Sequence, residues 1–368
     1  MVHGRWLDWR WWLGMRAVEV SQEPLKGIKV VAIVPAYNEE KHIEKTITSL
    51  QNQTYRLHKI IVVDDCSTDK TGEIARSLGV AVIRTPKNAG TKAQAQNYAL
   101  KQLGEDIDLF LAVDADTILK EDAVYEAMRY FNDPNTAVVC GSVVPQRVKT
   151  FWEYGRLGEY LFAQALLKRA QEHTSLVLVA SGCFSIFNLE AVRRLGYFDE
   201  RTLAEDMDIT WEFQDLGNRV YYARKALCYP VEPQTAKVYA AQLDRWYRGF
   251  LQNMKVRKFR IFRNNKPMAL MVYAFLLWFA VSALMMPLFF YSITADIMMT
   301  LVYVVLTHAT YVWVPSLICA YEFGLMKKAP LALVCYMVIP YINLVLYVRA
   351  FVREIVFGRT LAVWHKGH

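Results

Sequence analysis

Two aspartates separated by one residue, Asp114 and Asp116, end a short apolar run that begins at Asp108. If this run is a β-strand, alternate side chains share a face, so both carboxylates project from the end of the strand. Two adjacent carboxylates repel each other unless a cation lies between them, and hard oxygen ligands suit Mg²⁺ or Mn²⁺ that bridges to phosphates. The pattern indicates a metal and diphosphate site, although a lone D-x-D motif also occurs in ordinary acidic turns.

A second pair of acids, Asp64 and Asp65, follows another apolar run. If both runs are strands of a parallel sheet, both acid pairs lie at the edge where open α/β sheets bind their ligands. The first strand-to-helix turns contain neither a G-x-G-x-x-G motif nor a phosphate-loop lysine. The residues therefore favour a nucleotide held through its base, its ribose and a metal-bridged diphosphate.

The elements that must position these acids alternate between strand and helix patterns. Strand patterns occupy residues 29–35, 59–65, 80–84, 108–116, 137–144 and 177–187, and helical patterns follow most of them, including one over 153–171. Such alternation predicts an α/β fold with a mostly parallel, doubly wound sheet. The last strand is interrupted by Ser181 and Gly182, and a glycine inside a strand often marks the close approach of a ligand or another backbone.

Two further motifs follow in the chain. Glu205 and Asp206 open a helix, where acids are also favoured as caps by the helix dipole, so they have a structural interpretation beside a chemical one. Gln242, Arg245 and Trp246 form a Q-x-x-R-W motif shortly before a long apolar run. A basic helix on a membrane surface is the structural alternative for this motif.

The apolar residues are concentrated in the last third of the chain. The sequence of 368 residues is 54% hydrophobic with a net charge of +8, and residues 267–293, 297–321 and 329–348 form uncharged runs of membrane-spanning length. Several Lys and Arg residues lie beside these runs rather than in one basic block. The tendency of positive charge to stay on the cytosolic side of a membrane explains them more simply than binding of nucleic acid, which we do not expect as a partner.

The ends of the chain and its cysteines give weaker signals. The six cysteines show neither paired C-x-x-C spacing nor zinc spacing, so we expect reduced thiols. Four tryptophans among arginines near the N-terminus predict an interfacial helix, with a disordered leader as the alternative. Pro340 and Asn343 lie in the third apolar run, and a straight crossing there would place the basic tail outside the cell. We therefore expect this run to be bent, re-entrant or interfacial.

In their order, the four motifs resemble those of membrane-integrated family 2 glycosyltransferases of GT-A fold. This group includes the processive hyaluronan, chitin, cellulose and poly-N-acetylglucosamine synthases. The resemblance extends over residues 28–260 and includes smaller features such as Gly90-Thr-Lys-Ala93 and Glu232-Pro-Gln-Thr235. It implies a Rossmann-like GT-A catalytic domain with a mostly parallel sheet, followed by transmembrane helices.

The resemblance also implies roles in binding a nucleotide-sugar donor, here a UDP-sugar. Asp64 and Asp65 would hold the uracil and ribose. Asp116 would be the principal ligand of Mg²⁺ or Mn²⁺, with Asp114 beside the ribose, diphosphate and metal. The other donor contacts implied are Pro35, Tyr37 and Glu39 around the nucleoside, and Lys92 and Arg245 at the phosphates.

The catalytic residues implied lie further along the chain. Asp206, next to Glu205, resembles the general base, which takes a proton from the acceptor hydroxyl in a single displacement with inversion. Gln242, Arg245 and Trp246 resemble the motif at the acceptor end, where the flat apolar ring of Trp246 suits a sugar. All the expected carboxylates are present, which argues against a non-catalytic scaffold that merely kept the fold.

Five regions are therefore expected. They are an interfacial segment over 1–27, the GT-A domain over 28–235, the Q-x-x-R-W and interfacial helices over 236–266, about three transmembrane or re-entrant helices over 267–352, and a basic tail over 353–368. The catalytic domain would be cytosolic on a multi-pass protein of the cell membrane, in contact with membrane lipids.

The expected function is transfer of a sugar from UDP-GlcNAc or UDP-Glc to a growing β-linked glycan at the cytosolic face of the membrane. Three helices cannot readily enclose a polysaccharide. Either protomers assemble as a homo-oligomer, or the enzyme adds a single sugar to a polyprenyl-phosphate or glycolipid acceptor.

Overall fold

The computed structural model describes residues 20–174, 176–258, 266–298, 302 and 309–358. Most of the expected interfacial segment (1–27), most of the basic tail (353–368) and part of the second apolar run (297–321) lie outside these residues.

Within the described residues, the chain forms two compact units. The first unit comprises residues 20–146 and 170–231, and the second comprises 147–169 and 232–358. The chain therefore leaves the first unit once, returns to it, and leaves it again before the Q-x-x-R-W motif.

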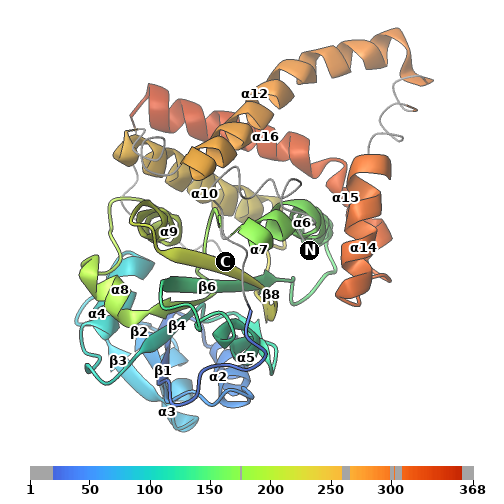
Figure 1. Ribbon diagram of the computed structural model, residues 1–368. Helices are drawn as coiled ribbons and strands as arrows, with labels where there is room; N and C mark the ends of the chain where they lie inside the picture. The colour runs from blue at the N-terminus through green and yellow to red at the C-terminus, as the bar shows by residue number, and fades with distance from the viewer. Residues whose placement is uncertain (1–19, 175, 259–265, 299–301, 303–308, 359–368) are drawn as a thin grey trace, which may run out of the picture. The chain divides into compact units, whose positions relative to one another are not determined.

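The first unit is built on a mixed sheet. Its strands are β1 (Val30–Ala36), β2 (Lys59–Asp64), β3 (Ala81–Arg84), β4 (Leu109–Val113), β5 (Ile118–Leu119), β6 (Thr136–Val143), β7 (Phe184–Asn188) and β8 (Arg219–Tyr229). In the described chain the strand order is β3-β2-β1-β4-β7-β6-β8-β5 (Figure 1). The first four strands in this order are parallel, whereas β7 runs antiparallel to both β4 and β6. The predicted α/β fold is confirmed, and the sheet is more mixed than expected.

Helices cover both faces of this sheet. One face carries α2 (Ile43–Gln51), α3 (Thr71–Ser77) and α5 (Ala123–Met128), and the other carries α4 (Lys92–Leu100), α8 (Leu189–Arg194) and α9 (Glu205–Asp215). In β1, Val30 and Ala32 pack with the first group, and Val31 and Ile33 pack with the second, because side chains alternate along a strand. Figure 1 shows α9 on the opposite side of the strands from α2 and α3.

The strand order places the carboxyl ends of β1 and β4 next to each other. The chain runs from β1 to β2 and β3 on one side, and β4 then pairs with the other side of β1. Ligands of open α/β sheets bind at such a reversal of strand order. Because β7 is antiparallel to β4 and Val113 pairs with Phe184, the residues just before β7 also reach this edge.

The strand expected over 177–187 forms only in its second half, as β7. The preceding residues lie along α9, where Trp211 Nε1 donates to the Leu178 carbonyl at 2.8 Å. The amide of Ala180 donates to Thr210 Oγ1 at 3.0 Å. Side chains of a helix thus satisfy backbone groups that a neighbouring strand would otherwise pair, so this part of the prediction is wrong.

The second unit is helical. It contains α6 (Phe151–Ala163), the π-helical turn η2 (Gln164–Lys168), α10 (Ala236–Arg257), α12 (Lys266–Ala295), the π-helical turn η3 (Ala309–Trp313), α14 (Val314–Glu322), α15 (Ala329–Tyr336), α16 (Ile339–Phe351) and the π-helical turn η4 (Val352–Val356). Thr150 and Glu153 form a capping box that starts α6. Gly158 lets α6 approach α15 closely, because a Cβ atom there would lie 2.6 Å from the Ala332 carbonyl oxygen.

The third apolar run is broken between α15 and α16, as expected for a bent segment. Among the residues that the structure describes, no helix by itself is both long enough and apolar enough to cross a membrane. Taken together, Ala329–Tyr336 and Ile339–Val356, which are bent by 44°, meet that test.

Candidate active site

Asp114 and Asp116 lie in a turn that follows β4, which ends at Val113, so they are not part of the strand expected over 108–116. Ala115 between them is buried, and its carbonyl accepts a hydrogen bond from Thr46 Oγ1 at 2.8 Å. The amide of Thr117 closes the turn by donating to the Asp114 carbonyl at 3.1 Å. The burial of Ala115 anchors the turn and leaves the two flanking carboxylates partly exposed.

Lys92 links this turn to the segment before β7. Its Nζ donates to Asp114 Oδ1 at 2.5 Å and to the Gly182 carbonyl at 2.8 Å. Burial by itself lowers the pKa of Lys92, but the carboxylates of Asp114, Glu205 and Asp206 outweigh it and raise the pKa above its usual value. Lys92 therefore remains a cation, although it sits in the first turn of α4 where the helix dipole disfavours positive charge.

Gly182 connects Lys92 to Asp206. The Gly182 amide donates to Asp206 Oδ2 at 3.0 Å, and the amide of Met207 donates to Asp206 Oδ1 at 2.8 Å. A Cβ atom at residue 182 would lie 2.7 Å from Lys92 Nζ, so a larger residue would require the ammonium to shift. Asp114, Lys92, Gly182 and Asp206 thus form a continuous chain of polar contacts within the first unit.

The two acids after β2 have different surroundings. Asp64 is fully buried, and its two oxygens accept hydrogen bonds from the Ser67 amide at 2.9 Å and from Arg84 Nη1 at 2.5 Å. Asp65 accepts hydrogen bonds through Oδ1 from Thr85 Oγ1 and the Ala89 amide. Both oxygens of Asp64 thus stabilise the turn after β2, which is a structural role. The described hydrogen bonds of Asp65 involve only its Oδ1.

The expected nucleoside pocket residues lie in the loop after β1. Asn38 is left-handed, with a φ of 55°, and its Oδ1 accepts from the Thr68 amide at 2.8 Å. The Glu39 amide donates to Thr71 Oγ1 at 2.7 Å, and the Glu39 side chain is buried. These bonds join the loops after β1 and β2 into one rim. Pro35 lies near the end of β1, whereas Tyr37 is exposed on the rim.

Gln242, Arg245 and Trp246 lie on α10 in the second unit, whereas Asp114 and Asp206 belong to the first. Gln242 Oε1 accepts a hydrogen bond from Arg156 Nη2 at 2.7 Å. Sequence reasoning did not single out Arg156. On a helix over 153–171, Arg156 lies away from the face formed by Tyr154, Leu161 and Ala165, so the apolar pattern gave no signal for it.

The acids at the end of β4 fit a divalent cation only together with other ligands. In the described parts of the chain, no cluster of three or more His, Cys, Asp or Glu residues could hold a metal. Asp114 and Asp116 nevertheless offer carboxylate oxygens, and the Asp114 side chain is 38% exposed. A Mg²⁺ or Mn²⁺ ion bound by one or two carboxylates completes its shell with water and substrate phosphates. The two aspartates fit that type of site.

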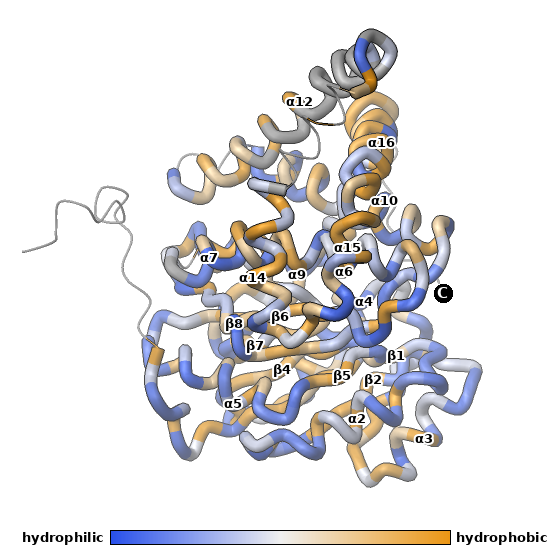
Figure 2. Tube along the Cα trace, turned by 90° about the vertical axis from the view of Figure 1, so that its right-hand side faces the viewer, coloured by the Kyte–Doolittle hydropathy of each residue, from blue (hydrophilic) through white to orange (hydrophobic). Residues whose placement is uncertain are grey.

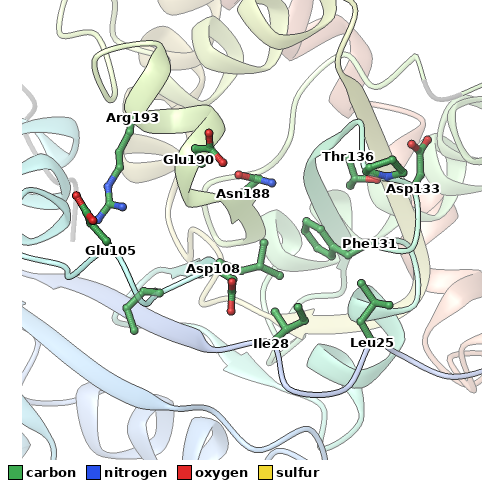
Figure 3. A pocket seen from close by; sticks show the side chains of 13 residues that line it. Leu25, Ile28, Glu105, Asp108, Phe131, Asp133, Thr136, Asn188, Glu190 and Arg193 are labelled. Carbon is green, nitrogen blue, oxygen red and sulfur yellow. The ribbon is translucent and has the colours of Figure 1, made fainter.

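A separate hollow of about 500 Å³ lies at the opposite edge of the sheet, near the starts of β4 and β6 (Figure 3). Its polar side chains are bonded to the protein itself. Arg193 donates to the carbonyls of Leu103 and Gly104, Asp108 accepts from the Lys29 amide, and Asp133 accepts from Tyr221. Neither Asp114 nor Asp206 lines this hollow, so it is separate from the candidate active site.

Comparison with known proteins relates the chain to glycosyltransferases. Residues 31–196 match the family described as Glycosyl transferase family 2. The chain is similar to the poly-beta-1,6-N-acetyl-D-glucosamine synthase of Staphylococcus aureus (strain COL), with 28% identity over 257 residues that cover 66% of this chain and 61% of the relative. The same enzyme of Staphylococcus epidermidis is 26% identical over 237 residues, covering 63% and 56%. The chain spans about six tenths of the length of these curated relatives.

One solved structure is similar along most of the chain. It is a mannosyltransferase from Pyrobaculum calidifontis, determined in complex with GDP-Man and Mn²⁺. The TM-score is 0.64 at 19% identity, and the match covers 95% of this chain and 94% of the other. At this level of identity the likeness concerns the fold.

Proposed function

We propose, from the match of residues 31–196 to Glycosyl transferase family 2, that the protein transfers a sugar from a nucleotide-sugar donor to a hydroxyl of a glycan or lipid-linked acceptor. The observation that carries the proposal is the chain of contacts from Asp114 through Lys92 and Gly182 to Asp206. It joins the acids suited to a metal-bound diphosphate to a carboxylate suited to general-base chemistry.

In this proposal the donor binds at the adjacent carboxyl ends of β1 and β4. Tyr37, Glu39 and Asp65 surround the nucleoside. Asp116 and Asp114 would hold Mg²⁺ or Mn²⁺, and a bound ion would supply positive charge to the departing diphosphate. Lys92 adds a second positive charge next to Asp114.

The reaction proposed is a single displacement. Asp206 takes the proton from the acceptor hydroxyl as that oxygen forms a bond to the anomeric carbon, while the bond between that carbon and the diphosphate oxygen breaks. Inversion at the anomeric carbon follows. The Gly182 amide orients the Asp206 carboxylate through its hydrogen bond to Oδ2.

The proposed donor is UDP-GlcNAc or UDP-Glc, and the proposed product is a β-linked glycan. Support comes from the named activity of the staphylococcal relatives, which make poly-N-acetylglucosamine. A single addition to a polyprenyl-phosphate or glycolipid is the second candidate.

We further propose that the second unit contacts membrane lipids and that the catalytic unit acts on the cytosolic side, with copies of the chain able to assemble there. Large apolar side chains are exposed on α14, α15 and α16, among them Ile318, Tyr321, Leu331, Val334 and Val345. Figure 2 shows these three helices as mostly hydrophobic. Exposed apolar surface of this extent supports a lipid or protein neighbour.

A donor panel tests the proposed function. Purified protein in detergent or nanodiscs is incubated with UDP-GlcNAc, UDP-Glc or GDP-Man, with Mg²⁺ or Mn²⁺ and lipid or oligosaccharide acceptors. We expect release of UDP with one UDP-sugar, and mass spectrometry of the product distinguishes a polymer from one added sugar. Turnover with GDP-Man alone would overturn the UDP assignment, and no turnover with any donor would overturn the transferase proposal.

Asp64 and Asp65 are expected to respond differently to the same substitution. Asp64→Asn removes a buried carboxylate that both Ser67 and Arg84 contact, so the free energy of unfolding should fall by about 1–3 kcal/mol. Asp65→Asn can keep the acceptor at Oδ1, so stability should change little, whereas nucleotide affinity should fall about tenfold. Urea unfolding and calorimetric titration with UDP measure the two effects. The assignment is wrong if Asp64→Asn is as stable as the wild type and only nucleotide binding suffers.

A further inference from the structure

Arg156 on α6 is a fully buried cation in the second unit. A buried charge is strongly unfavourable unless ion pairs and hydrogen bonds compensate it. The groups that contact Arg156 therefore indicate the role of this buried residue.

The edge of the Arg156 guanidinium makes three polar contacts. Nη1 donates to Glu159 Oε2 at 2.7 Å, and Nη2 donates to Gln242 Oε1 at 2.7 Å. Nε lies 3.3 Å from Glu232 Oε2, and Tyr160 donates to the other oxygen of Glu232 at 2.8 Å. These contacts connect α6, the segment after β8 and α10.

The faces of the same guanidinium lie against aromatic rings. Its central carbon is 4.7 Å from the Tyr239 ring centre and 4.9 Å from the Trp246 ring centre. A planar guanidinium can donate in its plane while it stacks on rings, which an ammonium cannot do. Arg156 therefore contacts two of the three motif residues, Gln242 through a hydrogen bond and Trp246 through its ring.

The cluster continues into the third apolar run. Asn343 on α16 accepts a hydrogen bond from the Tyr239 hydroxyl at 2.8 Å and donates to Glu159 Oε1 at 3.3 Å. This accounts for a polar asparagine in a run that is otherwise apolar. The orientation of the motif thus depends on α6, α10 and α16 together.

We propose that Arg156 is a positioning residue that sets the orientation of Gln242 and Trp246 for a sugar acceptor. The inference rests on the proposed transferase function. Because Gln242 Oε1 is bonded to Arg156, this oxygen holds the arginine rather than a substrate hydroxyl. Trp246 is half-buried, with Arg156 against its ring. The sugar ring of the acceptor would therefore pack on the part of the Trp246 side chain that is still exposed.

Arg156→Lys tests the proposal, because it keeps the charge and removes the planar fork. Arg248→Lys is the matched control, since Arg248 is a buried arginine of α10 whose guanidinium lies 3.2 Å from Glu354. We expect Arg156→Lys to lower kcat for transfer about 10- to 100-fold, because a small misplacement of a reacting group has effects of this size. UDP affinity should stay within about twofold, and donor hydrolysis by water should rise relative to transfer. The control should retain transfer within about threefold.

Two readouts separate positioning from a merely structural role. Gln242→Ala combined with Arg156→Lys should lose no more activity than Arg156→Lys alone, because both act through one contact. In protein labelled with 5-fluorotryptophan, the ¹⁹F resonance of Trp246, identified with Trp246→Phe, should shift in Arg156→Lys and stay in place in Arg248→Lys.

Several results would overturn the proposal. One is an equal loss of transfer activity in Arg156→Lys and Arg248→Lys. Another is a loss in the double variant that equals the product of the losses in the two single variants. A third is a Trp246 resonance that does not shift in Arg156→Lys. If the wild type itself releases no nucleotide from any donor, the proposed function fails instead. An active wild type with an unaffected Arg156→Lys variant would refute the positioning role alone.

Discussion

Asp206→Asn is expected to lower kcat for sugar transfer by about 10²- to 10⁴-fold, the usual contribution of a general base. The amide has nearly the same size, and its oxygen can still accept the hydrogen bond from the Gly182 amide. It cannot take the proton of the acceptor hydroxyl. UDP affinity should therefore persist while turnover is lost, as measured by nucleotide release and by calorimetric titration.

Asp215→Asn is the matched control, because Asp215 is the last residue of the same helix, α9. It should turn over like the wild type. Glu205→Gln tests the neighbouring acid, which lies close enough to Lys92 to raise its pKa. If Asp206→Asn keeps most of the activity and Glu205→Gln loses it, the base is Glu205 and the proposed role of Asp206 is wrong.

Lys92→Met should lower kcat/KM by about 10²- to 10³-fold, the effect typical of removing a preorganised group that stabilises charge. The ammonium lies between Asp114 and the Gly182 carbonyl, and without it Asp114, Glu205 and Asp206 lose their shared cation. Because Lys92 competes with a metal for Asp114 Oδ1, Lys92→Met should also bind Mn²⁺ more tightly when no nucleotide is present. Steady-state kinetics and metal titration measure these opposite changes.

Lys101→Met is the control for the loss of a lysine near α4, since Lys101 is exposed at the C-terminal end of that helix. It should behave like the wild type. Gly182→Ala should lower kcat/KM less than Lys92→Met does, because the added Cβ, 2.7 Å from Lys92 Nζ, displaces the ammonium without removing it. Wild-type kcat/KM in Lys92→Met would show that Lys92 is a structural ion pair without a part in transfer.

Several features of this protein were determined by local sequence alone. Continuous apolar runs such as 29–35 predicted buried strands, because a strand covered on both faces has no polar side. The acids at 114 and 116 were placed at a strand end, because the apolar run stops there. Pro340, Asn343 and the basic residues that follow led us to expect a bent, re-entrant or interfacial third apolar run, and the helices there are bent by 44°. Each of these properties depends on residues adjacent in the chain.

Only the tertiary structure decided which residues meet. It separated the tasks of Asp64 and Asp65, because Arg84, twenty positions from Asp64, engages one acid and not the other. It made β7 antiparallel and left the residues before it bonded to α9. It also brought Arg156 to Gln242, 86 positions later in the chain. Such contacts join segments far apart in sequence, and side-chain periodicity carries no information about which distant partner a charged group will find.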